Sequence, residues 1–254
     1  MSPRPRLRLF TLALAGFAAF FAAGVRGLRP VGQYSGPYGD VLNALAVYQR
    51  HATDVVTAIN FDYRAFDSLG EEFILFSSVA GVLLLLRQQH DEKHKQNSQE
   101  DRYETPQASD AMRVFTLALV GPLIVFGFYI VLHGQLTPGG GFQGGVIVAT
   151  APMMLYLSGQ FDDFKLITEP HWVEVAEAVG GGGFALVGLA ALLLHRNFLT
   201  NILPLGQTGN VFSAGTILLI SFLTGLEVGA GIILIMHQFL EHALEIEQRR
   251  RSGR

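Results

Sequence analysis

The chain has 254 residues, of which 50% are hydrophobic, 15% are charged and none is cysteine. Soluble domains usually carry about 25% charged residues, so this composition favours an integral membrane protein over a soluble enzyme domain. A formal net charge of -3 gives no reason to expect nucleic acid as a partner, and the absence of cysteine excludes disulfides, thiolate metal sites and thiol catalysis.

Apolar blocks recur along the chain, most of them close to the length of about 20 residues that a membrane-spanning helix needs. They predict an all-α, polytopic membrane protein with about six transmembrane helices, two before a polar segment and four after it, at residues 7–25, 69–86, 114–132, 142–156, 173–194 and 211–240. The first block follows Arg4, Arg6 and Arg8 as a signal peptide would, but it is long for one. We therefore predict a retained helix.

Between the first two blocks, residues 28–67 predict a loop and then an amphipathic helix. Val41, Leu42, Leu45 and Tyr48 recur at helical spacing, as expected for a helix at the membrane surface or against a partner. The pattern is also compatible with a membrane-embedded helix. Before the second block, Ser68 and Glu71 form a capping-box pattern at the expected start of the span.

The polar segment at residues 87–112 cannot bury a core and predicts a solvated linker. It divides the chain into a two-span segment (1–86), the linker (87–112), a four-span domain (113–247) and a basic tail (248–254). Most of the 18 Lys and Arg residues fall in segments that are cytoplasmic if the N-terminus is inside. Both termini are therefore predicted to be cytoplasmic, in a multi-pass protein of the inner (plasma) membrane.

Glu227 is the clearest ionisable residue within a span, in the stretch LISFLTGLEVGAGIILIM. A charge inside a bilayer is costly, so such a residue is a functional candidate. One interpretation is a proton or cation relay, and the other is a carboxylate bonded to a neighbouring helix as a structural contact. Thr224 lies on the same helical face, while Gly225 and Gly229 form a GxxxG pattern that suits close helix packing.

His133 ends the third span and is followed by GQLTPGGGFQGG. Histidine can exchange protons near neutral pH, but a residue at this position can equally be an interfacial side chain in contact with water. The glycine-rich stretch lacks the spacing of a phosphate loop. It predicts a tight turn whose backbone approaches another helix closely, formed by Pro138, Gly139, Gly140 and Gly141.

A cluster of charged residues precedes the second span, consisting of Asp62, Arg64, Asp67, Glu71 and Glu72. Four acids and one arginine at a span entrance could attract cations and pass them onward. The alternative is that the acids are placed there because the helix dipole favours negative charge near the N-terminus, and that Asp62 and Arg64 form a surface ion pair.

Four glycines at residues 180–183 interrupt the fifth span, which favours close helix packing or a local break. Glu174 and Glu177, just before them, are interpreted as solvated side chains near the interface. His237 and His242 are five residues apart, a poor spacing for metal ligands on a helix. We predict no metal site and no cofactor. No known catalytic motif occurs at a position where the expected secondary structure would support its function.

Two stretches of the four-span domain resemble a known family. HGQLTPGGGFQGGVIVATA (133–151) and NILPLGQTGNVFSAGTILLISFLTGLEVGAGI (201–232) are similar to the signatures of the MnhB (MrpB) subunit of multisubunit Na+/H+ antiporters. The resemblance covers about residues 112–247 and includes Gly144 and Gly145 of the glycine-rich turn. It implies that Pro138 and Phe142 matter for assembly or transport.

The first segment resembles a different part of these complexes. TDVVTAINFDYRAFDSLGEEFILFSSVAGVLLLL (53–86) is similar to the C-terminal end of the large MrpA protein and to the MbhE subunit of membrane-bound hydrogenases. The family motif DFRGFDTLGE stands here as DYRAFDSLGE, with Ala65 for the usual glycine. The matching residues are Asp62, Arg64, Asp67 and Glu71, and the resemblance places the first two near a sodium path. The chain is thus similar to a fusion of an MbhE-like segment with an MnhB subunit.

The resemblance implies an accessory subunit of an Mrp/Mnh-type Na+(K+)/H+ antiporter, which does not transport by itself. Its partners would be the large channel subunits and the small membrane subunits, and its ions Na+ and H+. A second hypothesis is the same module within a membrane-bound hydrogenase or another ferredoxin-linked respiratory complex. A third is a scaffold that seals a subunit interface and carries no ion.

Overall fold

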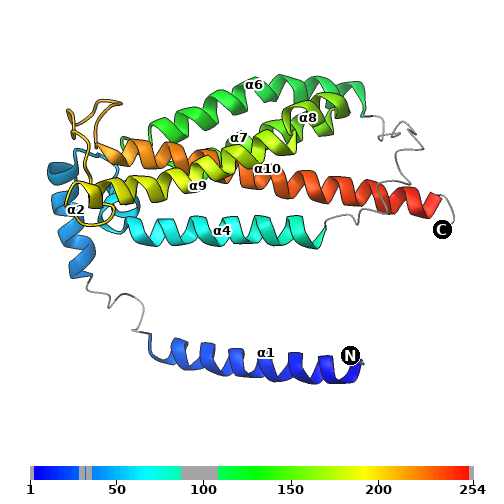
Figure 1. Cartoon of the computed structure of the whole chain (residues 1–254), viewed down its shortest axis with the longest axis horizontal. Helices are drawn as coiled ribbons and strands as arrows, with labels where there is room; N and C mark the ends of the chain where they lie inside the picture. The colour runs from blue at the N-terminus through cyan, green and yellow to red at the C-terminus, as the bar shows by residue number, and fades with distance from the viewer. Residues whose placement is uncertain (1–2, 29–31, 33–35, 87–107, 252–254) are drawn as a thin grey trace. The chain divides into compact units, whose positions relative to one another are not determined.

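The computed structural model describes residues 3–28, 32, 36–86 and 108–251 (Figure 1). Most of the expected linker, at residues 87–107, and the end of the basic tail, at residues 252–254, lie outside these ranges. The described helices are α1 (Pro3–Arg26), α2 (Pro37–Arg50), α3 (Val55–Ala58), the π-helical turn η1 (Ile59–Tyr63), α4 (Ala65–Leu85), α6 (Asp110–Leu132), α7 (Gly141–Leu157), α8 (Phe161–Ile167), α9 (Pro170–Leu193) and α10 (Thr216–Arg251).

The described residues contain 5 helices that are long and apolar enough to cross a membrane, together with the shorter apolar helix Gly141–Leu157. The all-α, polytopic fold with about six spans is therefore confirmed. The chain forms two compact units, Met1–Val41 and Leu42–Arg254. The first unit holds α1, at the position of the first expected span, and the second unit holds the other spans.

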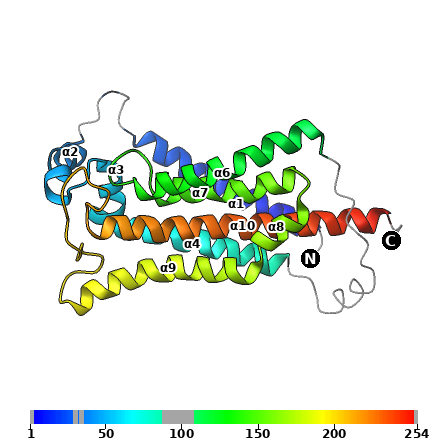
Figure 2. The same cartoon turned by 90° about the horizontal axis from the view of Figure 1, so that it is seen from above.

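Helix α10 is the central element of the second unit. It packs against α9, α7, α4 and α6, and Figure 2 shows it running between α7 and α9. Two apolar clusters form the core around it. One lies toward the start of α10 and includes Leu69, Phe184 and Ile220, and the other lies further along and includes Val79 and Leu234.

Glycines bring the backbones of α6, α7 and α10 into direct contact. A methyl group at Gly144 of α7 would lie 2.7 Å from the carbonyl oxygen of Gly127 in α6. One at Gly145 would lie 2.8 Å from the carbonyl oxygen of Gly225 in α10, and one at Gly229 would lie 3.4 Å from that of Gly145. Such close approach is what small residues permit between membrane helices.

One local prediction before the second span is wrong. Helix α4 begins at Ala65 and no side chain caps it. The chain enters α4 from the turn η1, so Ser68 already lies within the helix and its hydroxyl donates to the carbonyl of Asn60 at 2.8 Å. The capping box is therefore absent. Helix α2 stands where an amphipathic helix was expected. Its buried residues are Leu42 and Ala46, and Val41, Leu45 and Tyr48 are exposed, which is compatible with a helix at the membrane surface or against a partner.

One span boundary and one short helix also differ from expectation. Helix α10 begins at Thr216, five residues after the expected start, because Asn201 Oδ1 accepts the backbone N–H of Thr216 at 2.9 Å and holds the preceding loop at the helix start. The short helix α8, which contacts α7, was not expected, since only seven residues form it.

Candidate functional site

Three glutamates from three helices lie in the interior of the second unit. Glu72 of α4 and Glu227 of α10 are each 1% exposed, and Glu177 of α9 is 5% exposed. Each has a buried carboxylate oxygen without a hydrogen-bond partner among the described residues, namely Oε2 of Glu72, Oε1 of Glu177 and Oε2 of Glu227. Unpaired buried carboxylate oxygens are costly and uncommon. Glu72, Glu177 and Glu227, here called the glutamate layer, are therefore the strongest candidate site in the described part of the chain.

The first two acids form a pair held by a threonine. The Thr224 hydroxyl donates to Oε1 of Glu72, and the carboxyl groups of Glu72 and Glu227 are close enough to interact with each other. Two carboxyl groups can share a hydrogen bond only when one of them carries a proton, because an ionised carboxylate has no donor. The geometry is therefore suited to holding a proton between α4 and α10.

Glycines of α9 make room for the pair. A methyl group at Gly180 would lie 2.6 Å from the backbone nitrogen of Glu227, and one at Gly181 would lie 2.9 Å from its Oε2. Gly182, by contrast, faces open space. The glycine run at residues 180–183 therefore permits the close packing against α10 that its composition suggested, and it leaves space beside the Glu227 carboxyl.

The glycine-rich turn lies against α10 next to the pair. A methyl group at Gly141 would lie 2.6 Å from Cβ of Thr224 and 2.8 Å from the backbone nitrogen of Gly225. Gly140 has φ 125, a conformation that side chains disfavour, so the turn requires glycine there. Gly139 lies against the backbone of Ile130. Pro138 is exposed, and Phe142 packs against the first core cluster.

His133 lies at the end of α6. Its ring stacks on Tyr129 at 4.2 Å between centroids, and its Nδ1 is buried without a hydrogen-bond partner among the described residues. No hydrogen bond or ion pair in the described ranges joins His133 to the three glutamates.

The charged cluster before α4 does not converge on one point. Asp62 accepts from Arg50 Nε at 2.6 Å and from Asn201 Nδ2 at 3.0 Å. Arg64 pairs with Asp67 on the surface. The expected Asp62–Arg64 pair is therefore wrong, because the turn η1 directs Asp62 toward α2 and the loop before α10. The side chain of Glu71 is exposed.

Sequence reasoning singles out only one of the three interior acids, Glu227, as a residue within a span. It places Glu72 in a charged cluster at a span entrance, and its expectation that Glu177 is solvated is wrong, because Glu177 is 5% exposed. Helical spacing contains the missing signal: Glu177 stands at the spacing of the buried residues Val173, Gly180 and Phe184 of α9. Neighbouring Glu174, outside that spacing, is exposed.

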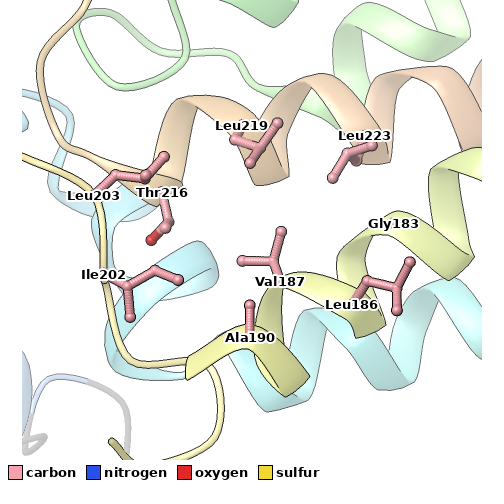
Figure 3. A pocket seen from close by; sticks show the side chains of 9 residues that line it. All are labelled: Gly183, Leu186, Val187, Ala190, Ile202, Leu203, Thr216, Leu219 and Leu223. Atoms are coloured by element: carbon pink, nitrogen blue, oxygen red, sulfur yellow. The ribbon is translucent and has the colours of Figure 1, made fainter. Parts of the chain in front are cut away.

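A separate cavity of about 340 Å³ opens between α9, the loop before α10 and the first turns of α10 (Figure 3). Its lining is apolar apart from Thr216, and it contains no ionisable side chain. No group of three or more His, Asp or Glu residues in the described ranges is arranged to hold a metal ion.

Membrane-spanning helices with ionisable groups at their centre define an integral, multi-pass membrane protein of the kind that handles ions. A family model for a domain related to the MnhB subunit of Na+/H+ antiporter matches residues 111–234. "Putative antiporter subunit mnhB2" of Staphylococcus aureus (strain Newman) is 40% identical over 102 residues, which are 38% of this chain and 72% of that relative. The chain belongs to the MnhB family.

Other relatives match a larger part of the chain. An uncharacterized protein of Methanocaldococcus jannaschii is 28% identical over 207 residues, covering 73% of this chain and 77% of the relative. A probable K(+)/H(+) antiporter protein of Rhizobium meliloti, named as a combined A/B subunit, is 30% identical over 210 residues, covering 72% of this chain but only 20% of the relative. The chain thus spans about a fifth of the length of that protein.

Two solved structures share the fold. A chain of the membrane-bound sulfane sulfur reductase, an archaeal respiratory membrane complex, matches with a TM-score of 0.69 and 30% identity, covering 94% of this chain and 99% of the other. A chain of the Mrp complex from Dietzia sp. DQ12-45-1b matches with a TM-score of 0.65 and 22% identity, covering 94% of this chain and 26% of the other. The second likeness concerns the fold alone.

Proposed function

We propose that this chain is an accessory membrane subunit of a multisubunit monovalent cation/H+ antiporter of the Mrp/Mnh type, and that Glu72 and Glu227 lie on its proton or cation path. The observation that carries the proposal is the carboxyl pair held by Thr224 at the centre of an MnhB-family fold. The chain acts as part of a secondary transporter and not as an enzyme. Its partners are the large channel subunits and the small membrane subunits.

The match to the combined A/B protein of Rhizobium meliloti supports the proposed fusion of two segments. It covers 72% of this chain, which is more than residues 111–234 of the MnhB-related domain, so it extends outside that domain. This favours an arrangement in which an MbhE-like segment at residues 1–86 precedes an MnhB-like domain at residues 113–247. The name of that relative also makes K+ a candidate ion beside Na+.

A second candidate function is a membrane subunit of a redox-linked respiratory complex that uses the same module. The observation that favours it is the 30% identity and 99% coverage of a chain from an archaeal respiratory membrane complex. In that case the redox groups would lie on other chains, and the glutamate layer would serve ion movement in the same way.

The test is neutralisation of each carboxyl of the pair in the complete complex. We expect Glu227→Gln and Glu72→Gln to lower the antiport rate of inverted membrane vesicles by about 100-fold, the lower end of what one positioned proton-transfer group contributes. Assembly, measured on native gels, should persist because glutamine keeps the size of the side chain. Glu174→Gln is the matched control, since Glu174 is exposed. Unchanged transport with unchanged assembly in both variants would instead support the scaffold hypothesis.

A further inference from the structure

Buried polar residues follow α10 through its whole membrane-spanning part. They are Thr216, Ser221, Thr224, Glu227 and His237, all of them at most 5% exposed. With a rise of 1.5 Å per residue, the stretch from the first to the last covers about 32 Å, which is close to the hydrocarbon thickness of about 30 Å. The first four lie within about 17 Å of one another along the helix axis, and His237 lies about 15 Å beyond Glu227. Polar groups inside a membrane are costly, which makes these residues candidates for a functional role.

Helix α9 runs antiparallel to α10 (Figure 1) and adds the next acid to this line. A methyl group at Gly231 would lie 3.4 Å from Oε1 of Glu177, and one at Gly181 would lie 2.9 Å from Oε2 of Glu227. Gly181 is four residues after Glu177, and Gly231 is four residues after Glu227, so each pair shares one face of its helix. The two unpaired oxygens therefore lie at the same helix contact, about four residues or about 6 Å apart along its axis.

His237 lies further along the same direction. It is six residues beyond Gly231, or about 9 Å along the axis, and 5% exposed. Its Nδ1 lies 3.2 Å from the hydroxyl of Thr168, which is fully buried. The ring lies against Phe164. Imidazole both accepts and donates protons near neutral pH, so this position suits the end of a proton route.

We propose that Glu177 and His237 extend the path that begins at the Glu72–Glu227 pair. The path follows α10 toward its C-terminal part, where His237 lies next to Thr168, and it carries protons. This rests on the proposed function. Each step moves one proton from a protonated carboxyl or imidazolium to an unprotonated acceptor, so only O–H and N–H bonds break and form. The step from Glu177 to His237 is the longer one, because His237 lies six residues beyond Gly231, or about 9 Å along the axis.

The proton is the favoured ion because each position on the path offers few oxygens. A cation that has lost its water needs several oxygen ligands. The Glu227–Glu177 step offers one unpaired carboxylate oxygen on each side.

Gly181 has a specific part in this path, because it leaves the space beside Oε2 of Glu227 open toward Glu177. A methyl group there would meet the far end of a flexible side chain, so the helix can fold while the space is filled. Gly182 is the matched control, since a methyl group there meets nothing within 4 Å.

The experiment compares these variants in the complete complex. We expect Glu177→Gln and His237→Gln to lower the antiport rate of inverted vesicles by about 100-fold, with normal assembly and with Glu174→Gln unchanged. Gly181→Ala should slow transport and Gly182→Ala should not. Infrared difference spectra of the assembled complex after a pH step should lose a carboxylic-acid carbonyl signal in Glu177→Gln, which a merely structural residue would not contribute.

The outcomes separate this inference from the proposed function. If Glu227→Gln abolishes transport while Glu177→Gln and His237→Gln behave like Glu174→Gln, the path does not run through them and the inference is wrong. If Glu177→Gln fails to assemble, equal transport rates for Gly181→Ala and Gly182→Ala would overturn it. If Glu227→Gln and Glu72→Gln both leave transport and assembly intact, the proposed role of the carboxyl pair is wrong and the scaffold hypothesis is supported.

Discussion

A single hydroxyl holds the carboxyl pair in place at the residue scale. Thr224 donates to Glu72 from a helix position where it is fully buried. Thr224→Val keeps the shape of the side chain and removes this donor. A hydrogen bond between membrane helices contributes about 0.6 to 1.7 kcal/mol.

We therefore expect Thr224→Val to destabilise the purified complex by about 1 kcal/mol and to slow antiport, since the Glu72 carboxyl loses its orientation. Thr224→Ser retains the hydroxyl and should behave nearly as the parent. Thermal unfolding of the purified complex, followed by circular dichroism, measures the first effect. A Tm for Thr224→Val equal to that of Thr224→Ser would contradict the assigned role.

At the scale of the elements, backbone contact between helices sets the position of the site. Gly144 lies directly against α6, and a methyl group there would force two backbones apart because a helix backbone cannot yield as a side-chain tip can. Overpacking of this kind costs about 1–3 kcal/mol.

We expect Gly144→Ala to lower the Tm of the complex and to reduce transport together with it, because α7 also carries the turn beside Thr224. Gly121→Ala in α6 is the control, since a methyl group at Gly121 meets nothing within 4 Å. Equal stability of the two variants would show that the α6–α7 contact is looser than the structure indicates.

The elements themselves were largely predictable from hydropathy, because a span needs only a continuous apolar block. Glu227 was also predictable, since its mid-span position depends on local sequence alone. Its partners were not: Thr224 and Glu72 are 152 residues apart, and Asp62 bonds to Asn201 across 139 residues. Such pairings depend on tertiary packing, which cannot be inferred from residue spacing or from composition.

At the scale of the whole molecule, the chain is one part of a larger assembly. We expect a tagged chain, purified from native membranes in mild detergent, to bring down large antiporter-like subunits without redox proteins, as determined by mass spectrometry. Hydrogenase or other redox subunits in the same particle would favour the second candidate function. A chain that purified alone as a stable oligomer would contradict both.

Helix α10 does more than line the site, because it continues to Arg251 as one helix of 36 residues. From Glu227 to that end the helix extends about 36 Å, so its end stands well beyond the depth at which the carboxyl pair lies. A continuous helix of this length acts as a lever: a tilt of about 10° at the pair would displace the far end by about 6 Å. A rigid tilt of this helix at Glu227 would therefore move its Arg251 end far more than any residue near the carboxyl pair.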